Sequence, residues 1–214
     1  MTKPVDVKIC GLSTPETLQT AIEAGARFVG FVFYEPSPRN VSFDIAWNLA
    51  RTVPTGVRSV GLFVNPEDEF LEHIVSGIQL DMIQLHGDET PGRINEIKQR
   101  FTMPVIKAIR VSTEDDLKDI EGYEAAADWL LFDAKPKNAK LPGGTGESFD
   151  WNILADRTFS KPWMLAGGIN EENVAEALSI LRPNAVDISS GVESSSGIKD
   201  PDKIKAFIKA VKAS

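Results

Sequence analysis

The stretch from Leu130 to Trp151 reads L-L-F-D-A-K-P-K-N-A-K-L-P-G-G-T-G-E-S-F-D-W, and the rest of the chain is interpreted outward from it. An apolar run, Trp129 to Phe132, precedes the carboxylate of Asp133 and then a long polar segment that contains three glycines. Side chains of an extended strand alternate between two faces, so Leu131 and Asp133 share one face. The stretch therefore predicts a strand that opens into a mobile lid, with Asp133 at the rim of an apolar face.

The same unit, an apolar run followed by a polar loop and an amphipathic segment, recurs along the chain. The predicted strands are Val5–Ile9, Phe28–Phe33, Arg58–Phe63, Met82–Leu85, Val105–Ile109, Trp129–Phe132, Trp163–Ala166 and Ala185–Ile188. The predicted helices are Thr14–Ala24, Phe43–Val53, Glu67–Val75, Pro91–Gln99, Thr113–Ile120, a short one near Trp151, Asn173–Leu181 and Pro201–Val211. Eight strand–helix units predict an α/β fold, a single-domain (β/α)8 TIM barrel over residues 1–214. An open doubly wound sheet is the rival, but no G-x-G-x-x-G follows the first strand.

Length and composition narrow the class of protein further. The 214 residues suffice for one barrel, and the formal net charge of −8 argues against broad nucleic-acid binding. It does not argue against a small anionic ligand, because backbone N–H groups and helix ends bind phosphate. We find no apolar run near the ~20 residues of a membrane span and no secretory apolar segment, so we expect a cytoplasmic protein. The single cysteine excludes an internal disulfide.

Chemistry in barrels of this kind sits where the strands end and the loops begin. The residues expected there are Cys10–Gly11, Tyr34–Arg39, Asn65, His86–Gly87, Arg110, Asp133–Gly146, Gly167–Gly168 and Ser189–Glu193. Asp133 is a candidate proton donor, since loss of hydration favours the neutral form of a carboxyl. The plainer alternative is a helix cap or a solvated loop carboxylate.

Two glycine-bearing turns come late in the chain. Gly167 and Gly168 follow the seventh predicted strand, and Ser190 and Gly191 follow the eighth. The corresponding loops of TIM barrels commonly form a phosphate site from backbone N–H groups. The sequence therefore predicts phosphate binding there, although such pairs also occur in ordinary turns.

Cys10 ends the first predicted strand, where a lone cysteine is most often a small buried apolar group. Lys8 lies two residues earlier on the same inward face, and a nearby ammonium lowers the pKa of a thiol. Asp187, on the eighth strand, is an alternative partner for Lys8 once the barrel closes. Both contacts can coexist, and the effect on the pKa of Cys10 is then smaller.

Arg39 and His86 are the remaining candidates for substrate binding. Arg39 follows a proline-restricted turn, and its guanidinium can bind a carboxylate through two parallel hydrogen bonds, unless it is simply solvated. His86 can shuttle protons or join a polar layer with Gln84 and Lys107, which strand parity predicts to point inward. No set of side chains has the spacing of metal ligands, so no metal is expected.

Seven motifs together resemble phosphoribosylanthranilate isomerase of tryptophan biosynthesis. They are K-I-C-G (8–11), G-F-V-F-Y-E-P-S-P-R (30–39), G-L-F-V-N (61–65), I-Q-L-H-G (83–87), F-D-A-K with G-G-T-G and F-D-W (132–151), L-A-G-G-I-N (165–170) and D-I-S-S-G-V-E (187–193). The resemblance covers essentially the whole chain in order. It implies an Amadori rearrangement of N-(5-phosphoribosyl)anthranilate in a (β/α)8 barrel, without a metal or organic cofactor.

The resemblance also implies roles for individual residues. Cys10 corresponds to the general base, Asp133 to the general acid and Arg39 to the arginine that contacts the anthranilate carboxylate. The glycine turns at Gly167–Gly168 and Ser190–Gly191 correspond to the phosphate site, and His86 and Asp187 are expected to line the substrate pocket. The sequence leaves the choice between a monomer and a homodimer open.

Two other interpretations of the function remain open. Another phosphosugar isomerase would be expected to carry acidic groups on the first and a middle strand, whereas this chain has Cys10 on the first. A non-catalytic phosphosugar-binding barrel has no need for an acid and a base on opposite strands.

Overall fold

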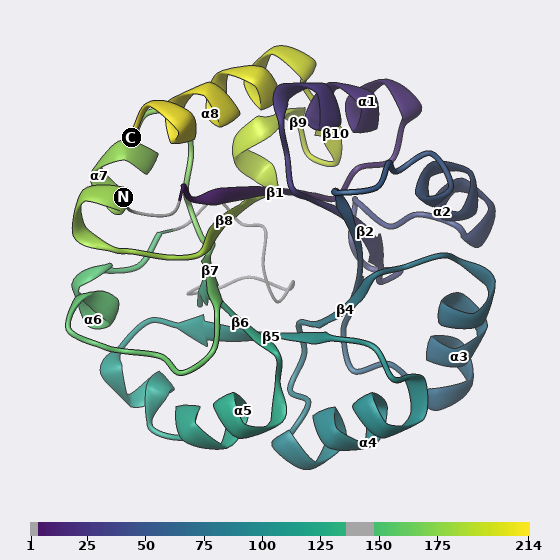
Figure 1. Ribbon diagram of the computed structural model, residues 1–214, viewed down its shortest axis with the longest axis horizontal. Coiled ribbons are helices and arrows are strands. Elements are labelled where there is room, and N and C mark those ends of the chain that lie inside the picture. The colour runs from purple at the N-terminus through teal and green to yellow at the C-terminus, as the bar shows by residue number, and fades with distance from the viewer. Residues whose placement is uncertain (1–3, 136–147) are drawn as a thin grey trace.

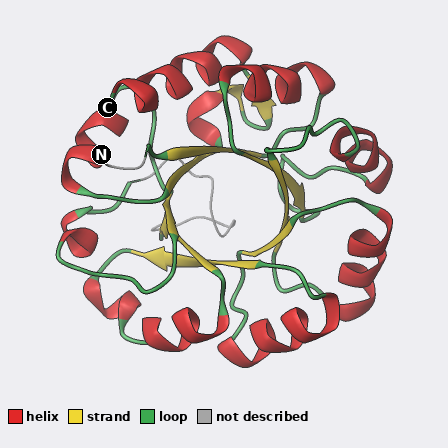
Figure 2. Ribbon diagram, in the orientation of Figure 1, coloured by secondary structure: helices red, strands yellow, loops and turns green. Residues whose placement is uncertain are grey.

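The protein forms one closed ring of eight parallel strands in the order β1 to β8, with helices outside it (Figures 1 and 2). This computed structural model describes residues 4–135 and 148–214. The strands are β1 Asp6–Cys10, β2 Phe28–Phe33, β3 Arg58–Phe63, β4 Met82–Leu85, β5 Val105–Val111, β6 Trp129–Ala134, β7 Trp163–Leu165 and β8 Ala185–Ile188. The predicted (β/α)8 barrel is confirmed. The predicted lid falls in 136–147, outside the described residues.

The helices are α1 Pro15–Ala24, α2 Phe43–Ala50, α3 Asp68–Gly77, α4 Pro91–Phe101, α5 Ile120–Ala126, α6 Asn152–Ala155, α7 Val174–Ile180 and α8 Pro201–Ala213. Several begin where the sequence supplies a side-chain cap. Thr14 accepts a hydrogen bond from the Thr17 N–H, and Thr90 accepts one from the Arg93 N–H. A proline follows each of these caps, where its missing N–H costs nothing. The last helix, α8, packs beside α1 and so covers the seam between the two ends of the chain (Figure 1).

Several elements differ from the sequence prediction, three of them near the site or in type. The helix predicted at Thr113–Ile120 is a 3-10 turn, Glu114–Leu117, followed by α5. The sixth strand continues to Ala134, so Asp133 lies within it instead of just after it. After β8 come a 3-10 turn, Ser190–Val192, and a two-stranded hairpin, β9 Glu193–Ser195 and β10 Ile198–Lys199, which the sequence prediction treated as loop.

Strand parity divides the core into an inner and an outer layer. An apolar plug fills the barrel and includes Phe28, Val60, Met82, Ile106, Leu131, Met164 and Ala185. A larger layer between strands and helices takes the alternate side chains, such as Ile9, Phe132 and Val186. Toward the strand ends the plug is followed by the apolar Val32 and Leu62 and by a polar set: Lys8, Gln84 and Asp187, then Cys10, His86 and Asp133.

Lys107 does not join this inner layer, so the prediction that it points inward was wrong. Its neighbours Ile106 and Ala108 belong to the apolar plug, which places Lys107 on the outer face of β5. There its Nζ donates to the Gly87 carbonyl at 2.7 Å and to Glu89 Oε2 at 2.6 Å. Burial lowers the pKa of Lys107 more than Glu89 raises it.

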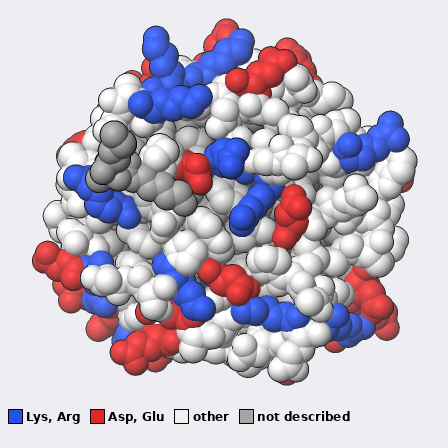
Figure 3. Space-filling view, in the orientation of Figure 1, with Lys and Arg blue, Asp and Glu red and all other residues white. Residues whose placement is uncertain are grey.

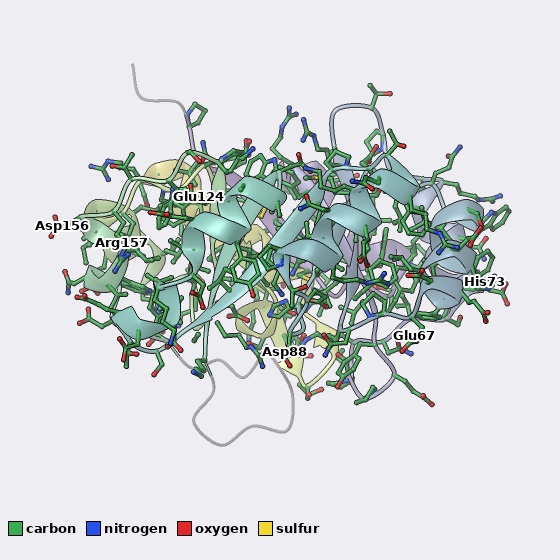
Figure 4. The ribbon with its side chains drawn as sticks, turned by 90° about the horizontal axis from the view of Figure 1, so that it is seen from below. Glu67, His73, Asp88, Glu124, Asp156 and Arg157 are labelled. Atoms are coloured by element: carbon green, nitrogen blue, oxygen red, sulfur yellow. The ribbon has the colours of Figure 1, made fainter. Side chains whose placement is uncertain are left out.

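The two ends of the barrel can be followed in Figure 4, which is seen from the side. Asp88 and Glu67 come just after β4 and β3 and lie toward the lower edge, whereas Glu124 precedes β6 and lies toward the upper edge. The lower edge is therefore the mouth formed by the carboxyl ends of the strands. Figure 3 shows the opposite end of the barrel, where positive and negative side chains are interspersed. None of the helices in the described part of the chain is long and apolar enough to cross a membrane.

Candidate active site

Cys10 is the last residue of β1 and points into the mouth of the barrel beside a buried ion pair. Lys8 Nζ donates to Asp187 Oδ1 at 2.9 Å, and this pair joins the first strand to the last. A Cβ placed on Gly30 would lie 3.0 Å from Cys10 Sγ and 3.3 Å from Lys8 Nζ. Glycine on β2 therefore leaves the room that the thiol and the ammonium occupy. Lys8 thus pairs with Asp187 and also interacts with Cys10, so the two predicted contacts coexist.

The Lys8–Asp187 ion pair and the burial of Cys10 together set the pKa of its thiol. Burial raises the pKa of Cys10, and the lowering effect of the Lys8 and Lys199 ammonium groups, opposed by the Asp187 charge, does not outweigh it. Burial alone would lower the pKa of Lys8, but Asp187 and Cys10 raise it above the ordinary range. Lys8 therefore remains charged, and Cys10 is a poorly acidic thiol whose thiolate is a correspondingly strong base.

Asp133 lies across the barrel from Cys10 within a chain of hydrogen bonds. Its Oδ1 accepts the Ala134 N–H at 2.9 Å, and its Oδ2 lies 3.1 Å from His86 Nε2. His86 Nδ1 lies 3.0 Å from Gln84 Nε2. An amide nitrogen can only donate, so Nδ1 accepts and the ring proton sits on Nε2, facing Asp133. Gln84 Oε1 is buried and has no partner among the described residues.

Arg39 is buried, with only 7% of its surface exposed, so the solvated alternative is wrong. Its Nε donates to Glu193 Oε1 at 2.7 Å and its Nη2 to Glu193 Oε2 at 2.9 Å. Its stem crosses the end of β1, because a Cβ on Gly11 would lie 2.8 Å from Arg39 Cδ. The Arg39 stem is thus held at the mouth beside Gly11, the residue after Cys10.

Glu193 and Lys199, on the β9–β10 hairpin, belong to the same cluster, and the sequence interpretation gave them no role. Lys199 Nζ donates to Glu193 Oε1 at 2.6 Å and to the Ser189 carbonyl at 3.0 Å. Burial alone raises the pKa of Glu193, but its contacts with Arg39 and Lys199 lower it below the ordinary range. The available signal was a pair of opposite charges six residues apart in the sequence, Glu193 and Lys199. Its interpretation required knowing that the loop is a hairpin folded onto Arg39.

The predicted phosphate-binding turns lie together. Gly167 and Gly168 have φ of 79° and 66°, a conformation that residues with a Cβ rarely adopt. Asn173 Nδ2 donates to the Gly168 carbonyl at 2.9 Å and fixes this turn against the start of α7. A Cβ on Gly191 would lie 2.6 Å from the Ile169 carbonyl oxygen, so the loop after β8 packs directly on the loop after β7. Ser190 opens the 3-10 turn at this place.

The structure therefore brings the predicted site residues to one mouth, in three groups. Cys10, Asp187 and Arg39 gather at β1 and β8, His86 and Asp133 meet between β4 and β6, and the glycine turns adjoin each other after β7 and β8. Within residues 4–135 and 148–214, no three His, Cys, Asp or Glu side chains converge as a metal site would require. The arrangement places a thiol, a carboxyl group, an arginine and two adjoining glycine turns around one mouth.

Comparison with known proteins gives a consistent picture. A model of the family described as N-(5'phosphoribosyl)anthranilate (PRA) isomerase matches residues 7–210. The N-(5'-phosphoribosyl)anthranilate isomerase of Paracoccus denitrificans is 54% identical over 205 residues, 95% of each chain. That of Paramagnetospirillum magneticum is 53% identical over 210 residues, 98% of each chain.

Solved structures with the same name also superpose on this chain. The phosphoribosyl anthranilate isomerase of Thermotoga maritima aligns with a TM-score of 0.87 and 40% identity, covering 98% of this chain and 100% of that one. Another, in complex with reduced 1-(o-carboxyphenylamino)-1-deoxyribulose 5-phosphate, aligns with a TM-score of 0.85 and 39% identity over the same shares. Since the family model and relatives above half identity both span nearly the full length, the chain belongs to the N-(5'-phosphoribosyl)anthranilate isomerase family.

Proposed function

We propose that this isomerase of tryptophan biosynthesis acts with Asp133 as its general acid and Cys10 as its general base. The reaction is the Amadori rearrangement of N-(5'-phosphoribosyl)anthranilate to 1-(2-carboxyphenylamino)-1-deoxyribulose 5-phosphate. One observation carries the proposal: Cys10 and Asp133 point inward from the carboxyl ends of β1 and β6, on different sides of a single mouth.

The first step opens the sugar ring. Protonated Asp133 gives its proton to the ring oxygen while the bond from that oxygen to C1 breaks, and the anilino nitrogen's electron pair forms the C1–N double bond. The product of this step is an iminium ion and a free C4 hydroxyl. His86 Nε2–H, facing Asp133 Oδ2, stabilises the carboxylate that remains after the transfer.

The second step moves a proton from carbon. The iminium ion acidifies the C2 proton, which the sulfur of Cys10 removes, and the electron pair of that bond becomes the C1–C2 double bond of an enol-amine. Loss of the enol proton and protonation of C1 then give the ketone. Burial, which raises the pKa of Cys10, makes its thiolate a stronger base but a less populated form at neutral pH.

The substrate's two anionic ends have separate places in the proposal. Arg39 takes the anthranilate carboxylate, and backbone N–H groups of Gly167, Gly168 and the Ser190–Gly191 turn take the phosphate. Asp187 lines the wall between them through its pair with Lys8. Holding both ends fixes C1 and C2 between the acid and the base, which contributes much of the rate.

A fluorescence assay tests the proposal. Purified protein mixed with phosphoribosylanthranilate should abolish its anthranilate fluorescence with turnover, whereas a non-catalytic phosphosugar-binding barrel would bind it without turnover. Asp133→Asn and Cys10→Ser should each lower kcat by about 10²- to 10⁴-fold, because each removes one proton-transfer group. Ser195→Ala, an exposed change on the hairpin, serves as the matched control and should leave turnover intact. Unchanged turnover in Asp133→Asn removes the acid role from this residue.

We propose further that the protein works in the cytoplasm as a monomer or a homodimer. The described catalytic groups all come from one barrel, and a free thiol used as a base suits a reducing compartment. A solved relative is described as monomers of dimeric phosphoribosylanthranilate isomerase from Thermotoga maritima. Sedimentation that shows a larger assembly, or fractionation that places the protein outside the cytoplasm, would contradict this.

A further inference from the structure

Glu193 and Lys199 are buried charged residues for which the mechanism above has no use. They are 7% and 6% exposed and pair across the β9–β10 hairpin, which follows β8. Burying a charged side chain costs desolvation free energy unless the group has well-placed partners of opposite charge or hydrogen-bonding partners.

Glu193 holds Arg39 through two parallel hydrogen bonds along one edge of the guanidinium, the edge formed by Nε and Nη2. The same carboxylate accepts from Lys199 Nζ at 2.6 Å and from the Gly197 N–H at 3.2 Å. With four donor groups from three residues around it, the carboxylate has little rotational freedom. The plane of the guanidinium is consequently fixed as well.

The hairpin is also locked against the turn that presents Arg39. Gly197 has a φ of 82°, and a Cβ there would lie 2.5 Å from the Pro38 carbonyl oxygen. Any other residue would be strained in conformation and would push the hairpin away from the turn. Glycine thus keeps Glu193 close enough to reach Arg39.

Lys199 connects this cluster to the strand that carries the sulfur. Besides Glu193, its Nζ donates to the carbonyl and the hydroxyl oxygens of Ser189, at 3.0 and 3.1 Å. Ser189 Oγ in turn donates to the Cys10 carbonyl at 3.0 Å. An unbroken series of contacts therefore runs from Arg39 through Glu193, Lys199 and Ser189 to the backbone of Cys10.

We propose that Glu193 and Lys199 are positioning residues for substrate selection: Glu193 orients Arg39 toward the substrate's aryl carboxylate, and Lys199 fixes Glu193 relative to the end of β1. The inference rests on the proposed role of Arg39. A guanidinium presents two edges that can each bind a carboxylate through paired hydrogen bonds, and Glu193 occupies the side edge. This orientation turns the other edge, Nη1 with the second hydrogen of Nη2, away from the hairpin.

A purely structural network predicts a different outcome from a positioning one. If Glu193 served only to hold the hairpin, its loss would lower stability and would weaken all ligands alike. If it orients Arg39, its loss specifically weakens ligands that carry the ring carboxylate. The discriminating quantity is the ratio of two inhibition constants.

The experiment compares the reduced product, 1-(2-carboxyphenylamino)-1-deoxyribitol 5-phosphate, with its counterpart that lacks the ring carboxylate. Both are titrated against the wild type, Glu193→Gln, Arg39→Ala and the double variant. We expect Glu193→Gln to lower the preference for the carboxylated ligand by about tenfold or more, since a charge-assisted contact is misplaced. Arg39→Ala should lower it at least as much, and Glu193→Gln should add nothing in the Arg39→Ala background.

Lys203→Met is the matched control. Lys203 Nζ donates to the Glu193 backbone carbonyl at 2.7 Å, so this change loosens the same hairpin without touching the carboxylate. Its thermal stability should fall while the ligand preference stays at the wild-type value. Lys199→Met should lower the preference, and Lys199→Arg should restore part of it.

Two results would overturn the inference: an unchanged preference in Glu193→Gln, or an equal loss when the change is made in the Arg39→Ala background. Failure of the proposed function looks different. In that case the wild type itself shows no turnover of phosphoribosylanthranilate. A wild type that turns over while Glu193→Gln keeps its preference refutes only the positioning role.

Discussion

Cys10 shows how the surroundings of a single residue set its chemistry. Its sulfur lies near two ammonium groups, which by themselves favour the thiolate, yet burial keeps its pKa above the ordinary range. The presence of Lys8 two residues earlier was visible in the sequence. The sequence offered Asp187 only as an alternative partner for Lys8, because the two residues are 179 positions apart and meet only when the barrel closes.

The raised pKa predicts the pH dependence of alkylation at Cys10. Because the thiolate is the reactive form, iodoacetamide labelling should accelerate with rising pH, with a midpoint above the value of about 8.5 for a free cysteine. Lys199→Met removes an ammonium that lowers this pKa, so its midpoint should move higher still. The single cysteine makes the label unambiguous by mass spectrometry. A midpoint below that of free cysteine would contradict the account.

Strand parity placed most, but not all, inward side chains correctly. It predicted Lys8, Gln84 and Asp133 on the inner face, where the structure has them. It was wrong for Lys107, because V-I-K-A-I is apolar on both faces and the alternation does not say which face is inside. The pairing of β5 with β4 and β6 decides which of its faces points into the barrel, and this pairing cannot be inferred from the sequence of one strand alone.

At the scale of elements, the strand–helix repeats were predictable because each combines a β-rich apolar run with a helical segment, and α1, α2, α4 and α8 begin at side-chain caps. The helix expected at Thr113–Ile120 was not. Asp116 instead accepts hydrogen bonds from the Ser112 and Thr113 N–H groups, which closes a short turn there, and α5 begins only at Ile120. The β9–β10 hairpin was missed for another reason. Its strands are short, rich in serine and without alternation, so its position depends on contacts made far away in sequence.

The hairpin also makes stability depend on pH. Burial alone raises the pKa of Glu193, but Arg39 and Lys199 lower it overall, so the ionised carboxylate stabilises the folded state. Because the pKa of Glu193 is lower in the folded than in the unfolded state, its ionisation adds to the free energy of unfolding. This contribution is complete above the pKa of the unfolded state, about 4.3, and is lost as the pH falls through the pKa of the folded state. Glu193→Gln should therefore be less stable than the wild type at neutral pH, with the difference shrinking in acid.

Urea unfolding measured from pH 7 down to pH 3 checks this. The Lys203→Met variant keeps the carboxylate and should lose stability by a similar amount at every pH. A gap between the wild type and Glu193→Gln that stays constant across the range would show that ionisation of Glu193 does not stabilise the fold.

On the scale of the whole molecule, closure of the barrel is what assembles the site. Eight equivalent units predicted the closed ring, and the ring brings the ends of β1, β4, β6, β7 and β8 to one mouth. Which mouth residues would meet was only partly predictable. The pairing of Lys8 with Asp187 was anticipated as an alternative, whereas the contact of Arg39 with Glu193, 154 positions apart, was not.

The central claim is that Cys10 and Asp133 act on two different atoms of one sugar held between them. The most direct test is a crystal structure of this protein with the reduced product bound. The account predicts Cys10 Sγ facing C2, the Asp133 carboxylate within about 3.2 Å of the C4 hydroxyl, and the phosphate on the turns after β7 and β8. A complex in which both groups lie on the same side of the sugar, or in which Asp133 does not reach the C4 hydroxyl, would contradict it.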